Sequence, residues 1–330
     1  MRRLIKTVLC SLPIFVFASM AGATTYTVTD LGPLVRPVAI NSSGSIVGHT
    51  LGVKIHAFSW QNGITTMLPE MSGGKSIAKA INNTGAIVGL IRIPGIGERA
   101  AMWQNGTPTD LGFKGVANGI NDQGKMVGWT ATGCSSSSSS VLTNVGNLGG
   151  NVSTITGINN GGLVIGDSET SDGWYDTSMN WQPYRHAFSW ANGALTDLGV
   201  LPGGHQSFAM AINNSCQIVG ASETNDGTHH AFMWQNCVMT DLGLQCNGAS
   251  SASGINNLGQ VVGQSTSTSG SIVATIWQSG TPVDLNTLIP AGSNWTLGQA
   301  TGINDAGNII GVGTVNGMAH GFVLTPAVGQ

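Results

Sequence analysis

The ten residues Ala39-Ile40-Asn41-Ser42-Ser43-Gly44-Ser45-Ile46-Val47-Gly48 carry the main structural signal, because versions of them recur along the chain. The asparagine of this phrase returns at positions 82, 121, 159, 213, 256 and 304. Asn and Gly tolerate the left-handed backbone of a tight turn, and consecutive β-branched residues suit a buried strand. The phrase therefore predicts a strand, a tight turn and a second strand, seven times.

Two further phrases complete each repeat. His56-Ala57-Phe58-Ser59-Trp60 predicts a third strand, and the Gln61-Asn62-Gly63 that follows is a strong hairpin signal. Thr109-Asp110-Leu111-Gly112 and its variants predict a fourth strand. Four short antiparallel strands in about 45 residues are typical of a propeller blade. The repeats predict an all-β, seven-bladed β-propeller of four-stranded antiparallel blades.

The two ends of the repeat region predict how the ring closes. The segment from Tyr26 to Gly32 is a fourth strand without its first three, and the segment from His320 to Leu324 is a third strand without its fourth. Because an exposed strand edge is a liability, we expect the two remnants to complete one blade. The predicted pairing joins Thr27 to Gly32 with His320 to Thr325.

The composition excludes several classes of protein. The 330 residues include 49 glycines and only 12 Lys+Arg and 15 Asp+Glu, while 41% of residues are hydrophobic. A disordered chain would be more charged and less hydrophobic, and a coiled coil would be rich in Ala, Glu, Lys, Leu and Arg. A weakly charged globular β protein remains.

The first 23 residues are predicted to be a signal peptide. Arg2, Arg3 and Lys6 precede an apolar stretch that ends at Met20, and Ala21-Gly22-Ala23 fits a cleavage site. Cleavage after Ala23 leaves a single domain, residues 24–330, and predicts secretion to the periplasm or the exterior. The three basic residues leave with the leader, so 9 basic and 15 acidic residues give a net charge near −6. Nucleic acids and anionic membranes are therefore not expected partners.

The His-Ala-Phe-x-Trp, Asn-x-x-Gly-x-Ile-Val-Gly and Thr-Asp-Leu-Gly phrases resemble those of the HAF-repeat family of probable extracellular bacterial proteins. The resemblance covers nearly all of the chain after the leader and implies a secreted repeat protein, from a family to which no general biochemical activity is assigned. The chain departs from the pattern at Arg99-Ala100-Ala101, at Val273-Ala274-Thr275 and around Cys134, where serines 135–140 replace the third strand of the third repeat. We expect an irregular blade there.

Residues that recur at one repeat position are expected to be structural, since a catalytic set is needed once. This applies to histidines that share one repeat position, His56, His186, His230 and His320, and to the aspartates 30, 110, 197, 241 and 284. It also applies to the tryptophans that precede the hairpin turn, Trp60, Trp103, Trp190, Trp234 and Trp277. We expect the histidines and aspartates to tie strands together and the tryptophans to fill the space between blades.

Function is expected on the face of the ring that holds the long connections, which we call the loop-rich face. Its largest insertion runs from Asp167 to Arg185, and exposed aromatic residues can bind sugars or anchor a protein partner. The predicted binding residues are Trp174, Tyr175, Trp181, Tyr184, Arg185 and Trp295. One alternative is that the insertion plugs the channel with buried aromatics. A second is a polysaccharide hydrolase or lyase that uses acids such as Asp167, Glu169 or Asp176.

No cofactor is expected, but two acidic turns leave a weak calcium possibility. These turns contain Glu169 and Asp172, and Glu223 and Asp226, beside glycines. A solvated acidic turn is the simpler interpretation.

Four cysteines remain after the leader in a protein predicted to be secreted. Cys216 and Cys237 replace turn glycines of two hairpins in one repeat, which predicts a disulfide between them. Cys134 and Cys246 fall on the opposite face, and no pairing is predicted for them.

Overall fold

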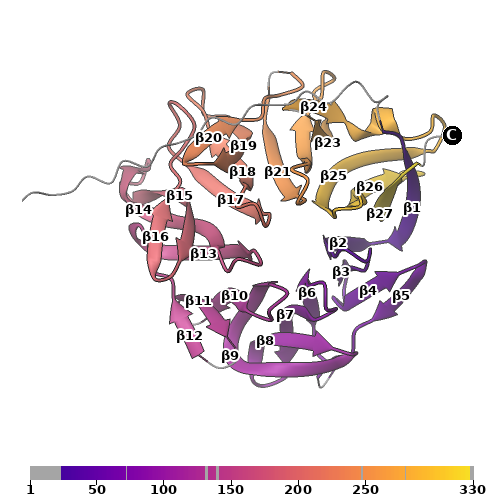
Figure 1. Ribbon diagram of the computed structural model, residues 1–330, viewed down its shortest axis with the longest axis horizontal. Helices are drawn as coiled ribbons and strands as arrows, with labels where there is room; N and C mark the ends of the chain where they lie inside the picture. The colour runs from indigo at the N-terminus through magenta and orange to yellow at the C-terminus, as the bar shows by residue number, and fades with distance from the viewer. Residues whose placement is uncertain are drawn as a thin grey trace, which may run out of the picture.

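The computed structural model describes residues 24–71, 73–130, 133–138, 141–246, 248–278 and 280–327. The predicted signal peptide lies outside the described residues. The sheets stand side by side around a central opening, and the chain passes round the ring in sequence order (Figure 1). The fold is an all-β propeller.

Five of the sheets have four strands. The first contains β2 (Val35–Ile40), β3 (Ile46–Thr50), β4 (Ala57–Gln61) and β5 (Ile64–Met67). Another contains β13 (Gly149–Ile158), β14 (Val164–Tyr175), β15 (Trp181–Ala191) and β16 (Ala194–Asp197). The next contains β17 (Ser207–Ile212), β18 (Ile218–Glu223), β19 (His229–Gln235) and β20 (Val238–Asp241). It is followed by β21 (Ser250–Ile255), β22 (Val261–Thr266), β23 (Ile272–Gln278) and β24 (Thr281–Asp284), and then by the short 3-10 helix η1 (Leu285–Leu288). The last combines β25 (Trp295–Ile303), β26 (Ile309–Val315) and β27 (Met318–Pro326) with β1 (Tyr26–Pro33).

The sixth sheet corrects the predicted blade count. It has seven strands, which are β6 (Ser76–Ile81), β7 (Ile87–Ile93), β8 (Gly97–Gln104), β9 (Thr107–Ile120), β10 (Met126–Thr130), β11 (Gly133–Ser138) and β12 (Val141–Asn144). The prediction of seven separate four-stranded blades is therefore wrong, because the propeller has six sheets and one of them carries two repeats.

The long strand β9 is the reason for the merger. It serves as the last strand of the second repeat, beside β8, and as the first strand of the third repeat, beside β10. The two parts follow each other directly, because Lys114 still pairs with Arg99 of β8 and the next residue, Gly115, already pairs with Thr130 of β10. A connection this short leaves no room for the chain to leave the sheet.

The serine-rich segment of the third repeat is a strand as well. β11 pairs with β10 from Met126 opposite Ser137 to Thr130 opposite Gly133, and with β12 on its other side. The expected loss of the third strand around Cys134 is therefore wrong for the backbone of residues 133–138. Backbone hydrogen bonding forms this strand without the His-Ala-Phe phrase.

The predicted ring closure is confirmed. β1 pairs antiparallel with β27, with Thr27 opposite Thr325 and Pro33 opposite His320, and the two strands lie together where the indigo and yellow ends of the chain meet (Figure 1). One bulge occurs between Asp30 and Gly32. Strands almost 300 residues apart thus complete one sheet without a covalent link.

The hydrophobic core lies between neighbouring sheets. Trp103 of β8 is 1% exposed and packs with Val47 and Ala57 of the preceding sheet. Trp277 packs in the same way on Val219 and Ala231. The remaining repeat tryptophans, Trp60, Trp190 and Trp234, also contact the preceding sheet or repeat. In these five repeats the tryptophan therefore packs between neighbouring sheets or repeats.

Candidate functional site

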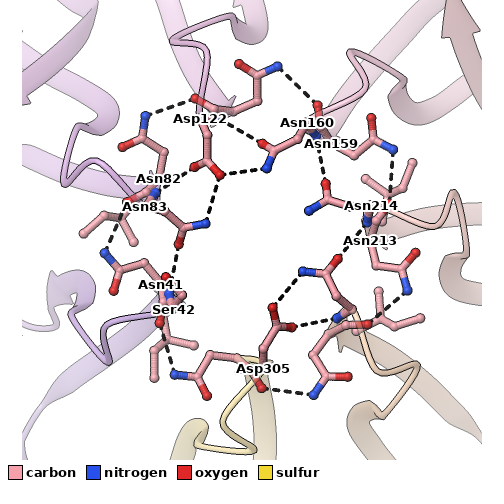
Figure 2. A pocket seen from close by; sticks show the side chains of 18 of the residues that line it. Asn41, Ser42, Asn82, Asn83, Asp122, Asn159, Asn160, Asn213, Asn214 and Asp305 are labelled. Carbon is pink, nitrogen blue, oxygen red and sulfur yellow. Dashed lines mark hydrogen bonds between the residues drawn. The ribbon is translucent and has the colours of Figure 1, made fainter.

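A closed ring of asparagine side chains lies at one end of the central channel (Figure 2). The seven repeat asparagines are buried, and each donates its side-chain N–H to the backbone oxygen of the corresponding asparagine in the next repeat, at 3.0 to 3.2 Å. The same amide oxygens accept backbone N–H groups four residues along, as Asn41 does from Ser45 at 2.9 Å. The residue that forms each turn therefore also joins it to the next repeat.

The residue after each asparagine forms a second tier at the same end. Its backbone N–H donates to the side chain at the equivalent position of the next repeat, as Asn83 does to Asp122 at 2.8 Å (Figure 2). Six such bonds are present around the channel. Asp122 also accepts from the side chains of Asn83 and Asn160. Burial raises the pKa of Asp122, but these hydrogen bonds outweigh it and the pKa is lowered overall. This end of the channel thus presents amides and carboxylates whose hydrogen bonds are directed around the ring.

A third ring of side chains lines the channel itself. Every innermost strand has a β-bulge three residues before its asparagine, and each bulged residue lies in the channel wall. These residues are Val38, Lys79, Asn118, Thr156, Met210, Ser253 and Thr301. A bulge turns a side chain out of the regular pleat. Each repeat therefore contributes one bulged residue to the channel wall. Sequence analysis missed this ring, although the differing residue three positions before each asparagine was a visible signal.

The insertion of the fourth repeat is a long hairpin on the loop-rich face. β14 and β15 continue their pairing beyond the other sheets, to Tyr175 opposite Trp181. Trp174, Tyr175 and Trp181 are 48%, 61% and 46% exposed, and the last two rings meet edge to face at 5.1 Å. The alternative of buried aromatics is therefore not what the structure contains.

A groove lies beside this hairpin. It has a volume of about 410 Å³, with Trp181 and Pro183 on one side and residues 149–152 and 169–171 on the other. Gly173 makes room for the ring of Trp181, because a Cβ at this position would lie 2.9 Å from it. The groove therefore combines an aromatic wall with backbone and hydroxyl groups.

The other predicted binding residues have structural partners. Tyr184 stacks on His205 with ring centroids 4.7 Å apart, and Trp295 packs edge to face on His320 and Phe322. Arg185 pairs with Asp167, which accepts from its Nε at 2.7 Å, and lies 3.8 Å from Glu169. The structure thus groups Trp174, Tyr175 and Trp181 at the tip of the hairpin, and gives Tyr184, Arg185 and Trp295 packing roles.

Asp167 and Asp176, two of the carboxylates considered for catalysis, lie far apart along the hairpin. Burial raises the pKa of Asp167, and Arg185 opposes this shift. Asp176 closes the hairpin tip by accepting from the backbone N–H groups of Asn180 and Ser178, and its pKa is lowered mainly by the Asn180 bond. Along the partner strand this span covers six residues, from Ala187 opposite Asp167 to Trp181 opposite Tyr175, the neighbour of Asp176, which is roughly 20 Å. This exceeds the ~5 to 10 Å between the carboxylates of a glycosidase.

The repeated histidines join the third and fourth strands. His186, His230 and His320 approach Asp197, Asp241 and Asp30 at 2.9, 2.7 and 2.8 Å. His56 pairs with Glu70, and Arg99 replaces the histidine opposite Asp110 at 3.1 Å. Each of these aspartates also accepts the backbone N–H of the glycine two residues later. The contacts made by these residues are contacts within a sheet.

The acidic turns considered for calcium cap their own loops. Asp226 accepts from Thr228 and Thr224, which lowers its pKa, and Glu223 and Glu169 accept backbone N–H groups from residues 205, 151 and 152. The described residues contain no group of three or more His, Cys, Asp or Glu side chains placed to hold a metal ion.

Cys216 and Cys237 occupy the turn positions that the sequence indicated. Their φ angles are 59° and 64°, values that favour glycine. Both thiols are free and exposed in the structure. The disulfide between Cys216 and Cys237 stays a prediction.

Comparisons with known proteins indicate the fold. No family model and no curated protein sequence matches the chain. The β-propeller domain of the Trilobed protease from Pyrococcus furiosus matches with a TM-score of 0.59 at 8% identity, over 94% of this chain and 96% of that one. The extracellular domain of a one-component system from B. thetaiotaomicron gives 0.52 at 12% identity, over 92% of this chain and 40% of that longer one. At such identities the likeness shows a β-propeller fold alone.

Within the described part of the chain, no helix is long and apolar enough to cross a membrane.

Proposed function

We propose that this chain is a secreted, non-enzymatic β-propeller that binds carbohydrate through the hairpin formed by β14 and β15. The observation that carries the proposal is the exposure of Trp174, Tyr175 and Trp181 on one hairpin tip. Exposing three large aromatic rings is unfavourable in water unless a ligand covers them. The signal peptide prediction and the resemblance to HAF-repeat proteins support secretion to the periplasm or the exterior.

The shape of the site favours a sugar over the flat surface of a protein. The groove of about 410 Å³ beside Trp181 is within the range of small-ligand sites. Trp181 lines this groove and also packs edge to face with Tyr175, which holds the ring before binding. Thr170 and Ser171 line the same groove and supply hydroxyl groups. A fixed aromatic wall opposite polar groups suits a ring with an apolar face and a hydroxyl edge.

A binding function also agrees with the positions of the carboxylates. Glu169 is the carboxylate in the groove, and its Oε2 accepts the N–H groups of Asn151 and Val152 at 2.9 and 3.0 Å. It therefore has a structural role, and Asp176 lies at the far tip of the hairpin. The hydrolase or lyase alternative gains no supporting observation from this arrangement.

A binding screen tests the proposal. Residues 24–330 are applied to an array of bacterial and plant glycans and to a panel of cell-surface proteins, in parallel with a Trp174→Ala and Trp181→Ala double variant. We expect the wild-type chain to bind one class of glycan and the double variant to lose that signal. Binding only to proteins, or glycan binding that is equal for both chains, would refute the carbohydrate site.

A further inference from the structure

The channel has a second cavity, at the loop-rich end and away from the hairpin. It has a volume of about 340 Å³, and its polar lining comes from Arg36, Lys79, Thr156, Ser253 and Gln299, together with Thr301. No Asp or Glu lines this cavity. Its size is at the lower end of small-ligand sites, so it suits a ligand of monosaccharide size or smaller.

Lys79 is the lysine that lines this cavity. It is the bulged residue of β6, half-buried in the channel wall, and it makes no ion pair or hydrogen bond among the described residues. The half-buried arginines elsewhere are paired, Arg99 with Asp110 and Arg185 with Asp167. A partly buried charge without a partner is costly, so an unpaired lysine at this position needs another explanation.

The groups around Lys79 are cationic or neutral. Arg36 lines the same cavity, and among the described residues its guanidinium donates to the side-chain oxygen of Gln299 alone, at 3.4 Å. His49 lies opposite Arg36 in the pairing of β2 with β3, and its Nδ1 is buried without a hydrogen-bond partner. Burial and then Lys79, Arg36 and Lys75 lower the pKa of His49 to about 4. Burial, Arg36 and Lys75 also lower the pKa of Lys79.

The two ends of the channel differ in charge. The asparagine-ring end carries the carboxylates of Asp122 and Asp305, whereas the loop-rich end carries Lys79 and Arg36. An anion is therefore attracted to the loop-rich end and repelled from the other. Ser253 and the neutral Gln299 add polar atoms there without adding negative charge.

We propose that the loop-rich end of the channel binds an oxyanion, a carboxylate or sulfate group, between Lys79 and Arg36. The ammonium and the guanidinium form charge-assisted hydrogen bonds with the oxyanion, which supplies the partner that Lys79 lacks. This site is distinct from the aromatic hairpin, so it does not depend on the carbohydrate proposal.

Isothermal titration calorimetry of residues 24–330 tests the site with three probes, sodium D-glucuronate, sodium sulfate and neutral D-glucose, at constant ionic strength. We expect glucuronate or sulfate to bind and glucose not to bind. Binding of both anions indicates a general oxyanion site, and binding of glucuronate alone indicates a carboxylate site. Absence of binding by both anions at millimolar concentration, or equal binding of glucose, would overturn the proposal.

Lys79→Met and Lys114→Met form a matched pair of variants. Lys114 is an exposed lysine of β9 outside the cavity. We expect Lys79→Met to weaken anion binding at least tenfold and Lys114→Met to change it less than twofold. Because Lys79 has no hydrogen-bond or ion-pair partner among the described residues, we expect Lys79→Met to keep or raise the melting temperature. Weaker anion binding by this variant would then not be explained by misfolding. Equal anion affinity of the two variants would overturn the assignment.

Discussion

Asn304 donates its side-chain N–H to the backbone oxygen of Asn41 at 3.1 Å, across 263 residues of sequence. This contact is the last of seven equivalent bonds and closes the asparagine ring. It lies at the channel, while the pairing of β1 with β27 closes the same junction further out. The first and last repeats of the propeller are thus joined both by a side-chain hydrogen bond at the channel and by strand pairing further out.

Breaking the ring should destabilise the whole domain. Asn304→Ala removes the donor to Asn41 and the turn bond to the Asn308 N–H, and leaves buried groups unsatisfied. We expect a loss of about 1 to 3 kcal/mol in the free energy of unfolding, measured by urea denaturation. Asn151→Ala is the control, because the exposed side chain of Asn151 makes no hydrogen bond in the described structure. Equal stability of the two variants would show that the ring contributes nothing.

The outer closure can be tested by truncation. A chain that starts at Pro33 lacks most of β1, so β27 loses its partner and Tyr26 leaves the core of the last sheet. We expect a sharply lower melting temperature than that of a chain starting at Thr25. An unchanged melting temperature would argue against a stabilising role for this strand.

The pairing of His186 with Asp197 predicts a pH dependence. Hydrogen bonding to Asp197 raises the pKa of His186, and the pKa of Asp197 is lowered by His186 and Gly199 against the effect of burial. Because its pKa is raised, His186 contributes fully to the stability of the folded protein below about pH 6.5. This contribution is lost as the pH rises through the folded-state pKa. Because its pKa is lowered, Asp197 contributes to the stability of the folded protein above about pH 4. This contribution is lost in more acidic solution. His186→Gln should therefore lower the melting temperature most near pH 5 and least near pH 9.

His49 should show the opposite pH dependence to His186, because its pKa is lowered rather than raised. Its pKa is lowered to about 4, so the unfolded chain takes up the proton first and the folded protein loses stability between about pH 6.5 and 4. His49→Gln should gain stability relative to the wild type as the pH falls through this range. Parallel pH profiles of the His49 and His186 variants would contradict the assignment of their environments.

The two turn cysteines give a prediction that depends on the redox state. Cys216 and Cys237 have positive φ, so with free thiols a change of Cys237 to Gly should stabilise by up to ~1 kcal/mol. If the proposed disulfide forms in protein purified without reductant, the same change should cost about 2 to 4 kcal/mol. We expect opposite shifts of the melting temperature with and without reductant. The same shift in both conditions would rule out the bridge.

The repeat phrases predicted most of the fold because their signals are local. Turn residues such as Asn62 and Gly63, and the pairing of Thr27 with Thr325, could be located from repeat phase alone. The merging of two repeats into one sheet could not, because it depends on the strand continuing without a break from Lys114, which pairs with β8, to Gly115, which pairs with β10. The asparagine ring was also missed, since each Asn donates to an acceptor in the next repeat, and Asn41 alone indicates only a turn.

The candidate site was predicted in part. The sequence placed Trp174 and Trp181 in the longest insertion, and both are exposed. It did not distinguish them from Trp295, whose contacts with His320 and Phe322 arise only when β25 and β27 join the same sheet on either side of β26. It also missed Lys79, because a bulge that turns a side chain into a channel is a property of strand pairing.

The affinity for the glycan identified by the array, measured by calorimetry, tests the proposed function most directly. Trp181→Ala is compared with Trp129→Ala, which removes a tryptophan of similar exposure, 45% against 46%, from β10. Carbohydrate binding on the hairpin predicts at least a tenfold loss of affinity for Trp181→Ala and less than a twofold change for Trp129→Ala. An unchanged affinity of Trp181→Ala would contradict it.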